Sequence, residues 1–329
     1  MKAMSSDQSY VATFGEALVV LIQEQGGPLE DAVRFTRSMG GAEINVAIGL
    51  NDYGIHTSVI TQLGNDGFGR YIRGSLAALG VDTSAIGVDE VHTTGMYVKE
   101  VGGDTGLPSD LGSGRSAMHY YRASSAGAHM SPSYLDVPAV AAVLERSNLI
   151  HTTGITPALS RSASEAQQSL FRRMNGRSLV SFDMNWRPRL WSGREQEGRK
   201  VIGEFFRDSD IAIAGVDETD SVFGMSDPDD IRRAFPQPRW LVLKNGAGVV
   251  SAFDGDERVD VAARIGVEVV EPIGAGDAFA SGFLAGILEA RSLGECVAQG
   301  HDTAVRALGS SADHIRPDRM ARDNAEGLS

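Results

Sequence analysis

Extended apolar segments alternate with amphipathic segments along most of this 329-residue chain. Such alternation is typical of β-α-β units, in which parallel strands form one sheet and helices cover its faces. It therefore predicts an α/β fold with a mostly parallel central sheet. The strands are expected at Tyr10–Leu21, Thr57–Leu63, Asn148–Thr153, Ser178–Asn185, Asp210–Ala214 and Arg239–Lys244.

Two stretches depart from this alternation, Gln23–Gly40 and Thr93–Ala123, because they contain short β-like runs and no helical pattern. The second stretch predicts a hairpin of Thr94–Val101 and Ser116–Ala123 around a loop rich in Gly and Ser, Gly102–Gly114. Segments of this kind would form a small sheet that stands on the main body.

The charge and composition narrow the classes of partner. A formal net charge of −13 leaves no excess of Lys and Arg to neutralise phosphates, so no nucleic-acid partner is expected. Cys296 is the one cysteine, so no intrachain disulfide can form. Near the N-terminus, the apolar run Ala17–Ile22 is too short for a signal sequence or a membrane span. These features predict a cytoplasmic protein with no membrane partner.

The run Gly274-Ala275-Gly276-Asp277 is the first candidate for chemistry. Its glycines allow a tight turn where a strand ends and a helix begins, and the N–H groups of a first helical turn attract anions. Asp277 would face a hydroxyl group that approaches this anion, so it is the candidate general base. The helix N-terminus is expected to lower its pKa. Taken alone, the run is more often an ordinary glycine turn with an aspartate that stabilises the helix.

A second glycine pair, Gly40-Gly41, precedes a predicted helix that carries Asn45 in its first turn. The backbone at such a pair can approach a hydroxylated ligand, and the Asn amide can both donate and accept hydrogen bonds. An ordinary loop-to-helix junction with a solvated Asn45 would show the same residues.

Tyr120 and Arg122 share one face of the predicted hairpin, because alternate residues of a strand point the same way. Tyr97 lies on the partner strand. A phenol and a guanidinium group aimed together suit a ligand with hydroxyl groups and a carboxylate. The alternative is an exposed strand with a cross-strand Tyr pair.

Two further runs follow strand ends, where open α/β sheets bind their ligands. Asp183–Pro188 places Arg187 there as a second cation, although a loop arginine is more often simply solvated. Leu243–Gly248 is rich in glycine and by itself indicates a hairpin turn.

Together these runs resemble the ribokinase-like (PfkB) sugar kinases, from about Tyr10 to Asp313. The matching runs are Gly40-Gly41 through Asn45 to Gly64-x-Asp66-Gly67-x-Gly69, and Gly274 to Asp277. The resemblance implies one three-layer α/β domain over residues 1–329, with a small β-sheet lid from segments of about 16–40 and 93–123. It also implies ATP and Mg²⁺ as cofactors and a homodimer formed through the lid. It leaves open whether a monovalent cation is also required.

The resemblance also assigns roles to residues. Asp277 would be the catalytic base, with Gly274, Ala275 and Gly276 around the transferred phosphoryl group. Glu218 would help to hold the metal. Sugar contacts would come from Gly40, Gly41, Asn45, Tyr97, Tyr120, Arg122, Arg187 and Asp313, and ATP contacts from Asn185, Lys244, Gly246, Gly248 and His301.

Within the family, the chain is most similar to the kinases that phosphorylate the terminal hydroxyl of 2-keto-3-deoxygluconate. The supporting runs are Tyr120–Arg122 with Ser125–Gly127, Thr153–Ser160, and Asp183–Arg187 followed by Leu190-Trp191. Ribose, fructose or another keto-deoxy acid remains an alternative acceptor. So does a sugar-binding protein without catalytic activity.

Three positions depart from the family pattern. Glu271 stands where an aspartate is common, two residues before Ile273. Gly215 replaces the amide of an Asn-x-x-Glu element that ends at Glu218. His301 stands at the adenine-side asparagine. The first two departures bear on the metal and cation sites, and the third bears on the nucleotide contacts.

Overall fold

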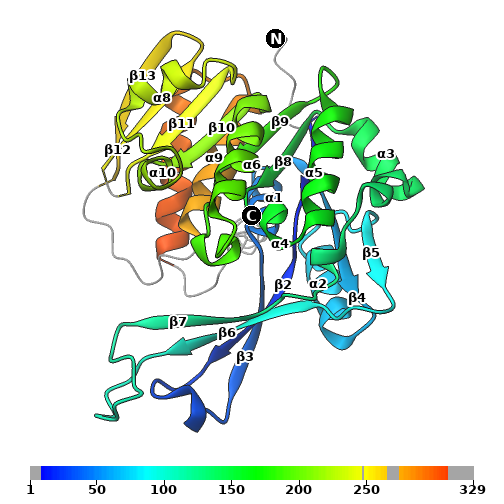
Figure 1. Cartoon of the computed structure of the whole chain (residues 1–329), viewed down its shortest axis with the longest axis vertical. Coiled ribbons are helices and arrows are strands. Elements are labelled where there is room, and N and C mark those ends of the chain that lie inside the picture. Colours follow the sequence, from blue (N-terminus) through cyan, green and yellow to red (C-terminus); the bar gives the residue numbers. More distant parts are fainter. Residues whose placement is uncertain (1–8, 247, 265–273, 310–329) are drawn as a thin grey trace, which may run out of the picture.

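A nine-stranded sheet forms the centre of the molecule (Figure 1) in a computed structural model that describes residues 9–246, 248–264 and 274–309. Its strand order is β13-β12-β11-β10-β9-β8-β1-β4-β5. All neighbouring strands from β11 to β5 pair in parallel, and β12 and β13 add an antiparallel edge. The strands are β1 Tyr10–Phe14, β4 His56–Gly64, β5 Ile86–Asp89, β8 Leu149–Thr153, β9 Leu179–Asp183, β10 Ile211–Gly215, β11 Trp240–Lys244, β12 Val249–Asp254 and β13 Glu257–Ala262.

Helices cover both faces of this sheet, so the body has three layers. One face packs against α3 Pro138–Arg146, α5 Arg161–Met174 and α6 Glu195–Asp208, and the other against α1 Ala42–Asp52, α9 Ala275–Leu288 and α10 Leu293–Leu308. The remaining helices are α2 Gly67–Ala78, α4 Thr156–Leu159, α7 Val216–Phe223 and α8 Pro228–Ala234. Within the described ranges, no helix is long and apolar enough to cross a bilayer.

The helices follow from their apolar spacing. In α6 the buried residues Gly198, Ile202, Phe205 and Phe206 recur at the interval of one helical face. By contrast, every residue of α9 from Ala278 to Leu288 is buried, which is typical of a helix enclosed by its neighbours. The helix is therefore enclosed from Ala278 onward, while its first turn stays accessible.

A second sheet of four strands, called the small sheet below, stands at the lower end of the body in Figure 1. Its order is β3-β2-β6-β7, and it confirms the predicted α/β fold with a small additional sheet. The predicted hairpin is present, with Tyr97 opposite Tyr120. The strands are β2 Leu18–Gln23, β3 Phe35–Gly40, β6 Gly95–Val101 and β7 Ser116–Tyr121.

The single strand predicted over Tyr10–Leu21 is wrong. The chain forms β1, leaves the central sheet at Gly15-Glu16-Ala17, and enters the small sheet as β2. The break falls at a glycine, and a Cβ at Gly15 would overlap the carboxyl group of Glu43. The hydrophobic pattern of two successive strands that belong to different sheets is the same as that of one long buried strand.

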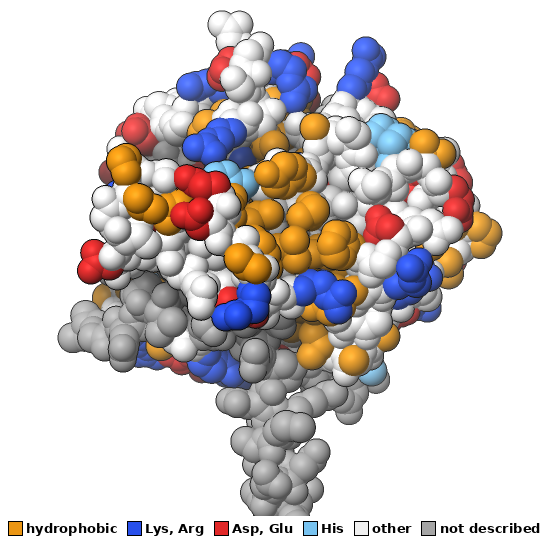
Figure 2. All heavy atoms as spheres, turned by 90° about the horizontal axis from the view of Figure 1, so that it is seen from below, with side chains coloured by type: hydrophobic (Ala, Val, Ile, Leu, Met, Phe, Trp, Pro, Cys, Tyr) orange, Lys and Arg blue, Asp and Glu red, His pale blue; other side chains and the backbone are white. Residues whose placement is uncertain are grey.

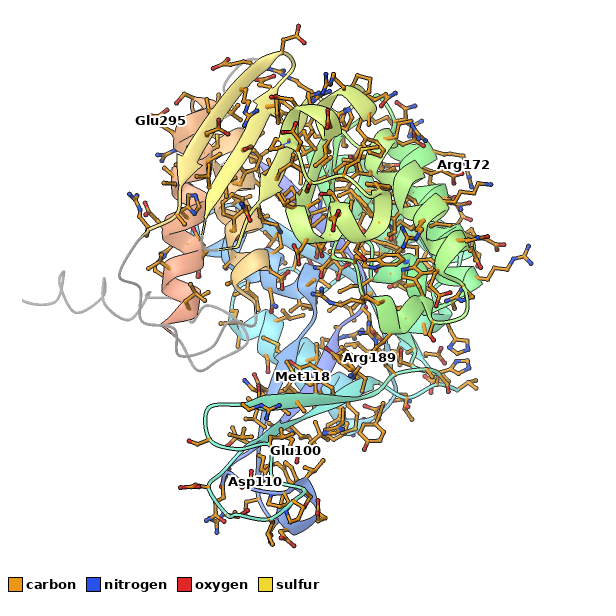
Figure 3. The ribbon with its side chains drawn as sticks, turned by 60° about the vertical axis from the view of Figure 1, so that its left-hand side comes forward. Glu100, Asp110, Met118, Arg172, Arg189 and Glu295 are labelled. Atoms are coloured by element: carbon orange, nitrogen blue, oxygen red, sulfur yellow. The ribbon has the colours of Figure 1, made fainter. Side chains whose placement is uncertain are left out.

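The loop between β6 and β7 is organised by one side chain. Asp110 accepts hydrogen bonds from the backbone N–H groups of Gly103 (2.8 Å), Thr105 (2.9 Å) and Gly112 (3.0 Å). These donors favour the ionised carboxylate, so they hold the pKa of Asp110 far below its usual range. The loop is therefore an ordered turn at the far end of the small sheet (Figure 3).

Candidate active site

A cavity of about 1920 Å³ lies between the small sheet and the carboxyl ends of strands β9, β10 and β11. Figure 3 labels Met118 on the small sheet and Arg189 on the body, and both residues line the cavity. Of the predicted site residues that the structure describes, Gly248 is the one outside the lining. Asp313 and the departure at Glu271 lie outside the described residues. The cavity lining therefore gathers the others: Gly40, Gly41, Asn45, Tyr97, Tyr120, Arg122, Asn185, Arg187, Glu218, Lys244, Gly246, Gly274, Ala275, Gly276, Asp277 and His301.

The N-terminus of α9 opens into this cavity. Gly274 precedes the helix with φ 80°, a left-handed conformation that costs a glycine little. The N–H groups at the start of a helix have no partner within it, and no described side chain caps α9. Gly276 is exposed, so a ligand can approach the backbone closely. This arrangement suits a phosphate group.

Asp277 stands in the first turn of α9 and accepts a hydrogen bond from Nδ2 of Asn45 at 2.8 Å. Burial raises its pKa to about 6, and the negative charge of Asp183 acts in the same direction. The Asn45 hydrogen bond and the charges of Lys244 and Arg187 oppose this rise. The expectation of a lowered pKa is wrong, because desolvation outweighs the helix terminus.

Lys244 is a cation beside the glycine turn. Its Nζ lies 2.8 Å from Oδ2 of Asp183 and 3.6 Å from where a Cβ of Gly276 would stand. Burial alone would lower the pKa of Lys244, but the charges of Asp183, Glu218 and Asp277 raise it. The ammonium group therefore stays charged beside the first turn of α9.

The role of Asp183 was missed in the sequence. Its Oδ1 is buried and accepts no hydrogen bond from the described residues, while its Oδ2 holds Lys244. The sequence did carry a signal for Asp183. It ends a buried strand and is the first residue of the run Asp183–Pro188, which also contains Arg187. A free carboxylate oxygen at this point is suited to a metal ion or to a ligand hydroxyl group.

Glu218 is fixed by two backbone donors. Its Oε2 accepts from the N–H of Gly215 and its Oε1 from the N–H of Trp186, both at 2.8 Å. Burial raises its pKa, and Asp183 adds to the rise. No cluster of three or more His, Cys, Asp or Glu side chains that could hold a metal occurs among the residues described. Glu218 and Asp183 are two carboxylates of the kind that Mg²⁺ binds together with phosphate oxygens and water.

On the small sheet, Tyr97, Tyr120 and Arg122 are brought together as the hairpin predicts. The two tyrosine rings lie 5.1 Å apart between centroids, and the Arg122 guanidinium carbon is 5.5 Å from the Tyr120 ring. However, the guanidinium group forms an ion pair with the buried carboxylate of Glu16. The charge of Arg122 is therefore already balanced within the protein.

Arg187 presents a more accessible charge to the same cavity. Its side chain is 52% exposed, and Nη1 lies 4.0 Å from Oε1 of Glu218. That separation in a solvated setting is a weak ion pair. A ligand carboxylate can therefore bind Arg187 without breaking a strong internal contact.

Glu43 is a further carboxylate in the cavity lining that was not among the predicted site residues, although it lies between Gly41 and Asn45. Its Oε1 accepts from the hydroxyl groups of Thr153 (2.8 Å) and Thr156 (3.2 Å). Burial raises the pKa of Glu43 to about 7, and the charge of Asp277 adds to this. Glu43 is therefore a second buried carboxyl group near Asp277 whose pKa is raised.

One group of lining residues is mostly apolar. Phe279, Val250, Ala304, Val305 and Leu308 line the cavity together with His301. The ring of His301 packs edge-on against Phe279, and its Nε2 lies 3.3 Å from the carbonyl oxygen of Val261. Such a wall suits a planar, mostly apolar group such as a nucleobase.

Residues 8–315 match the model of the pfkB family carbohydrate kinases. The match covers more than half of the chain, so the protein belongs to this family. It is therefore a kinase that phosphorylates a carbohydrate.

Three known proteins illustrate the similarity. The chain is 32% identical to a 2-dehydro-3-deoxygluconokinase of Thermoproteus tenax, over 84% of this chain and 81% of that protein. It superposes on a PfkB protein from Polaromonas sp. JS666 with a TM-score of 0.81 and 30% identity, over 96% and 99% of the two chains. A sugar kinase from Pyrococcus horikoshii, solved in complex with ATP, gives a TM-score of 0.79 and 25% identity, over 95% and 97%.

Proposed function

We propose that this kinase transfers the γ-phosphoryl group of ATP to the terminal hydroxyl group of 2-dehydro-3-deoxygluconate, also called 2-keto-3-deoxygluconate. The observation that carries the proposal is the position of Asp277. Its carboxylate faces a cavity that has a phosphate-binding helix start on one side and an accessible arginine, Arg187, on the other. The Thermoproteus relative supports the sugar acid, and the Pyrococcus relative supports ATP.

In the proposed reaction, Asp277 accepts the proton of the sugar hydroxyl group as its oxygen bonds to the γ-phosphorus and the bond to ADP breaks. The N–H groups of Ala275, Gly276 and Asp277 and the ammonium group of Lys244 stabilise charge on the moving phosphoryl group. Asn45 fixes the orientation of the Asp277 carboxylate. Magnesium, when bound, would neutralise phosphate charge, and Glu218 and Asp183 would hold it.

The accessible charge of Arg187 would bind the carboxylate of the sugar acid. Arg122, whose charge is balanced by Glu16, would contribute hydrogen-bond donors to sugar oxygens. The phenol groups of Tyr97 and Tyr120 would line the same wall. This division would favour an acid over a neutral sugar, because only the acid uses Arg187.

The proposal is tested by a coupled assay of ADP release with 2-dehydro-3-deoxygluconate, a second keto-deoxy acid, ribose and fructose. A charge-assisted contact is worth about 10- to 100-fold in binding, so we expect kcat/KM for the sugar acids to exceed that for ribose and fructose by at least this factor. Equal efficiency with ribose or fructose would contradict the choice of a sugar acid. An absence of turnover with all four would contradict the kinase assignment to these acceptors.

We also propose that the small sheet joins two copies of this chain while it covers the sugar. Figure 2 shows the face that is lowest in Figure 1, and hydrophobic side chains gather at its centre with Lys and Arg beside them. The ladder register places Phe35 and Tyr121 on one face of the small sheet, where they are 36% and 61% exposed. Apolar exposure of this kind is typical of an interaction surface.

A dimer formed through this face should be visible in solution. We expect light scattering at micromolar concentration to give twice the chain mass, and Phe35→Glu to give the monomer because a charge would be buried. Val137→Glu is the matched control, since Val137 is similarly exposed on the body and should leave the mass unchanged. A wild-type monomer would rule out the dimer and leave the covering role of the sheet open to kinetic test.

A further inference from the structure

Glu16 is a buried carboxylate that the proposed reaction does not use. It is 2% exposed and lies between β1 and β2, where the chain leaves the central sheet for the small sheet. Burying a carboxylate is unfavourable unless the protein supplies partners for it. The contacts of Glu16 therefore indicate its structural role.

The chain passes between body and small sheet at four places, and Glu16 contacts all of them. It occupies the first. At the second, after β3, a Cβ on Gly41 would overlap the carbonyl oxygen of Glu16. At the third, where β6 begins, a Cβ on Gly95 would lie 2.9 Å from its Oε1. At the fourth, after β7, the hydroxyl group of Ser125 donates to Oε1, and a Cβ on Gly127 would lie 2.6 Å from Cγ.

The same carboxylate holds Arg122, which lies between β7 and the fourth crossing. The guanidinium group pairs with Oε2 of Glu16, and the two side chains are 10% and 1% exposed. Nε of Arg122 is buried and has no hydrogen-bond partner among the described residues, although Arg122 lines the cavity. The ion pair therefore fixes a guanidinium group that still has a donor to offer.

We propose that Glu16 is a positioning residue that couples the placement of the small sheet to the sugar site through Arg122. The coupling follows from burial, because Glu16 loses its counter-ion whenever the fourth crossing moves away from the first. The small sheet and the Arg122 donor are thus held in place by one contact. This inference rests on the proposed function only in assigning Arg122 to the sugar side of the cavity.

Kinetics with Glu16→Gln and Glu16→Asp give the first test. Without the charge of Glu16, Arg122 loses its fixed orientation. We expect KM for the sugar acid to rise about tenfold in Glu16→Gln, with kcat and KM for ATP changed by less than about threefold. Glu16→Asp, which keeps the charge, should recover part of the loss. A KM that is unchanged or lower in Glu16→Gln would overturn the proposal.

Asp82→Asn is the matched control for general damage. Asp82 also pairs with an arginine, Arg146, at 2.6 Å, and neither residue lines the cavity. We expect its KM values to equal those of the wild type. If Asp82→Asn raises KM for the sugar acid as much as Glu16→Gln does, the effect is a general loss of structure and the proposal is overturned.

A double-variant cycle tests whether Glu16 acts through Arg122. If it does, Glu16→Gln adds little once Arg122→Gln is present, so the double variant should have KM within about threefold of Arg122→Gln alone. If the two substitutions raise KM for the sugar acid by factors that multiply in the double variant, the coupling through Arg122 is overturned.

Hydrogen exchange gives a readout that needs no sugar. The amides of Ser125 and Ala126 bond to Arg122 and Thr93 at the crossings, at 3.1 and 2.9 Å. We expect them to exchange at least about tenfold faster in Glu16→Gln and at the wild-type rate in Asp82→Asn. Unchanged exchange in Glu16→Gln would overturn the proposal. If the wild type does not phosphorylate the sugar acid, the proposed function fails, and exchange alone decides the role of Glu16.

Discussion

Replacing Asp277 with Asn lowers kcat by about 10²- to 10⁴-fold, the usual contribution of a positioned general base. The amide has the same shape and can still accept the hydrogen bond from Asn45, so KM for the sugar and for ATP should change little. Steady-state kinetics and thermal unfolding of the purified variant are the measurements. Asp136→Asn, an exposed carboxylate paired with Arg173, is the control and should keep the wild-type kcat. A variant that retains half of the wild-type kcat would remove Asp277 from the mechanism.

The pH dependence of the wild type checks the same assignment. Burial raises the pKa of Asp277 to about 6, and only the ionised form can accept a proton. The rate should therefore rise with pH through about 6 and fall about tenfold for each unit well below it. The residual rate of Asp277→Asn should not show this fall at low pH, which is called the acid limb of the rate profile. If the variant keeps the same limb, another group titrates.

Replacing Arg187 with Ala raises KM for the sugar acid by about 10- to 100-fold and leaves KM for ATP nearly unchanged. The physical reason is the loss of the accessible counter-charge for the carboxylate, because Arg187 is half exposed and only weakly paired with Glu218. Arg172→Ala, on the outer surface of α5 (Figure 3), is the control and should behave as the wild type. KM for neutral sugars should be the same in Arg187→Ala as in the wild type. An equal rise in KM for neutral sugars and for the sugar acid would contradict the carboxylate role.

Arg187→Ala should also move the acid limb of the rate profile. The positive charge of Arg187 lowers the pKa of Asp277, so its removal should shift the midpoint to higher pH. Arg122→Ala is a less direct test of sugar binding, since it would leave Glu16 buried without its counter-ion. Breaking such a pair costs about 3–5 kcal/mol of stability. For Arg122→Ala we therefore expect a loss of folded protein, whereas the glutamine of Arg122→Gln can still donate a hydrogen bond to Glu16 and keeps the protein folded for kinetics.

Much of the architecture was predictable from local pattern. Alternating strands and helices predict the mostly parallel sheet, and the helix-free stretches predict the hairpin of the small sheet, because side-chain periodicity reports which face is buried. The glycine turn before Asp277 was predictable for a similar reason. Its residues are adjacent in the chain, so the helix start and the carboxylate are placed together by local geometry.

Tertiary structure decided the charges of the site. Asn45 and Asp277 are 232 positions apart, and the pairs Asp183–Lys244 and Glu16–Arg122 likewise join distant segments. Whether Arg122 is a free cation, and whether Asp277 titrates near 4 or near 6, depends on the partners and the burial that these segments provide. Desolvation and charge pairing act through space, so residue identity and spacing determine which groups are present, and only packing determines which of them carry a usable charge.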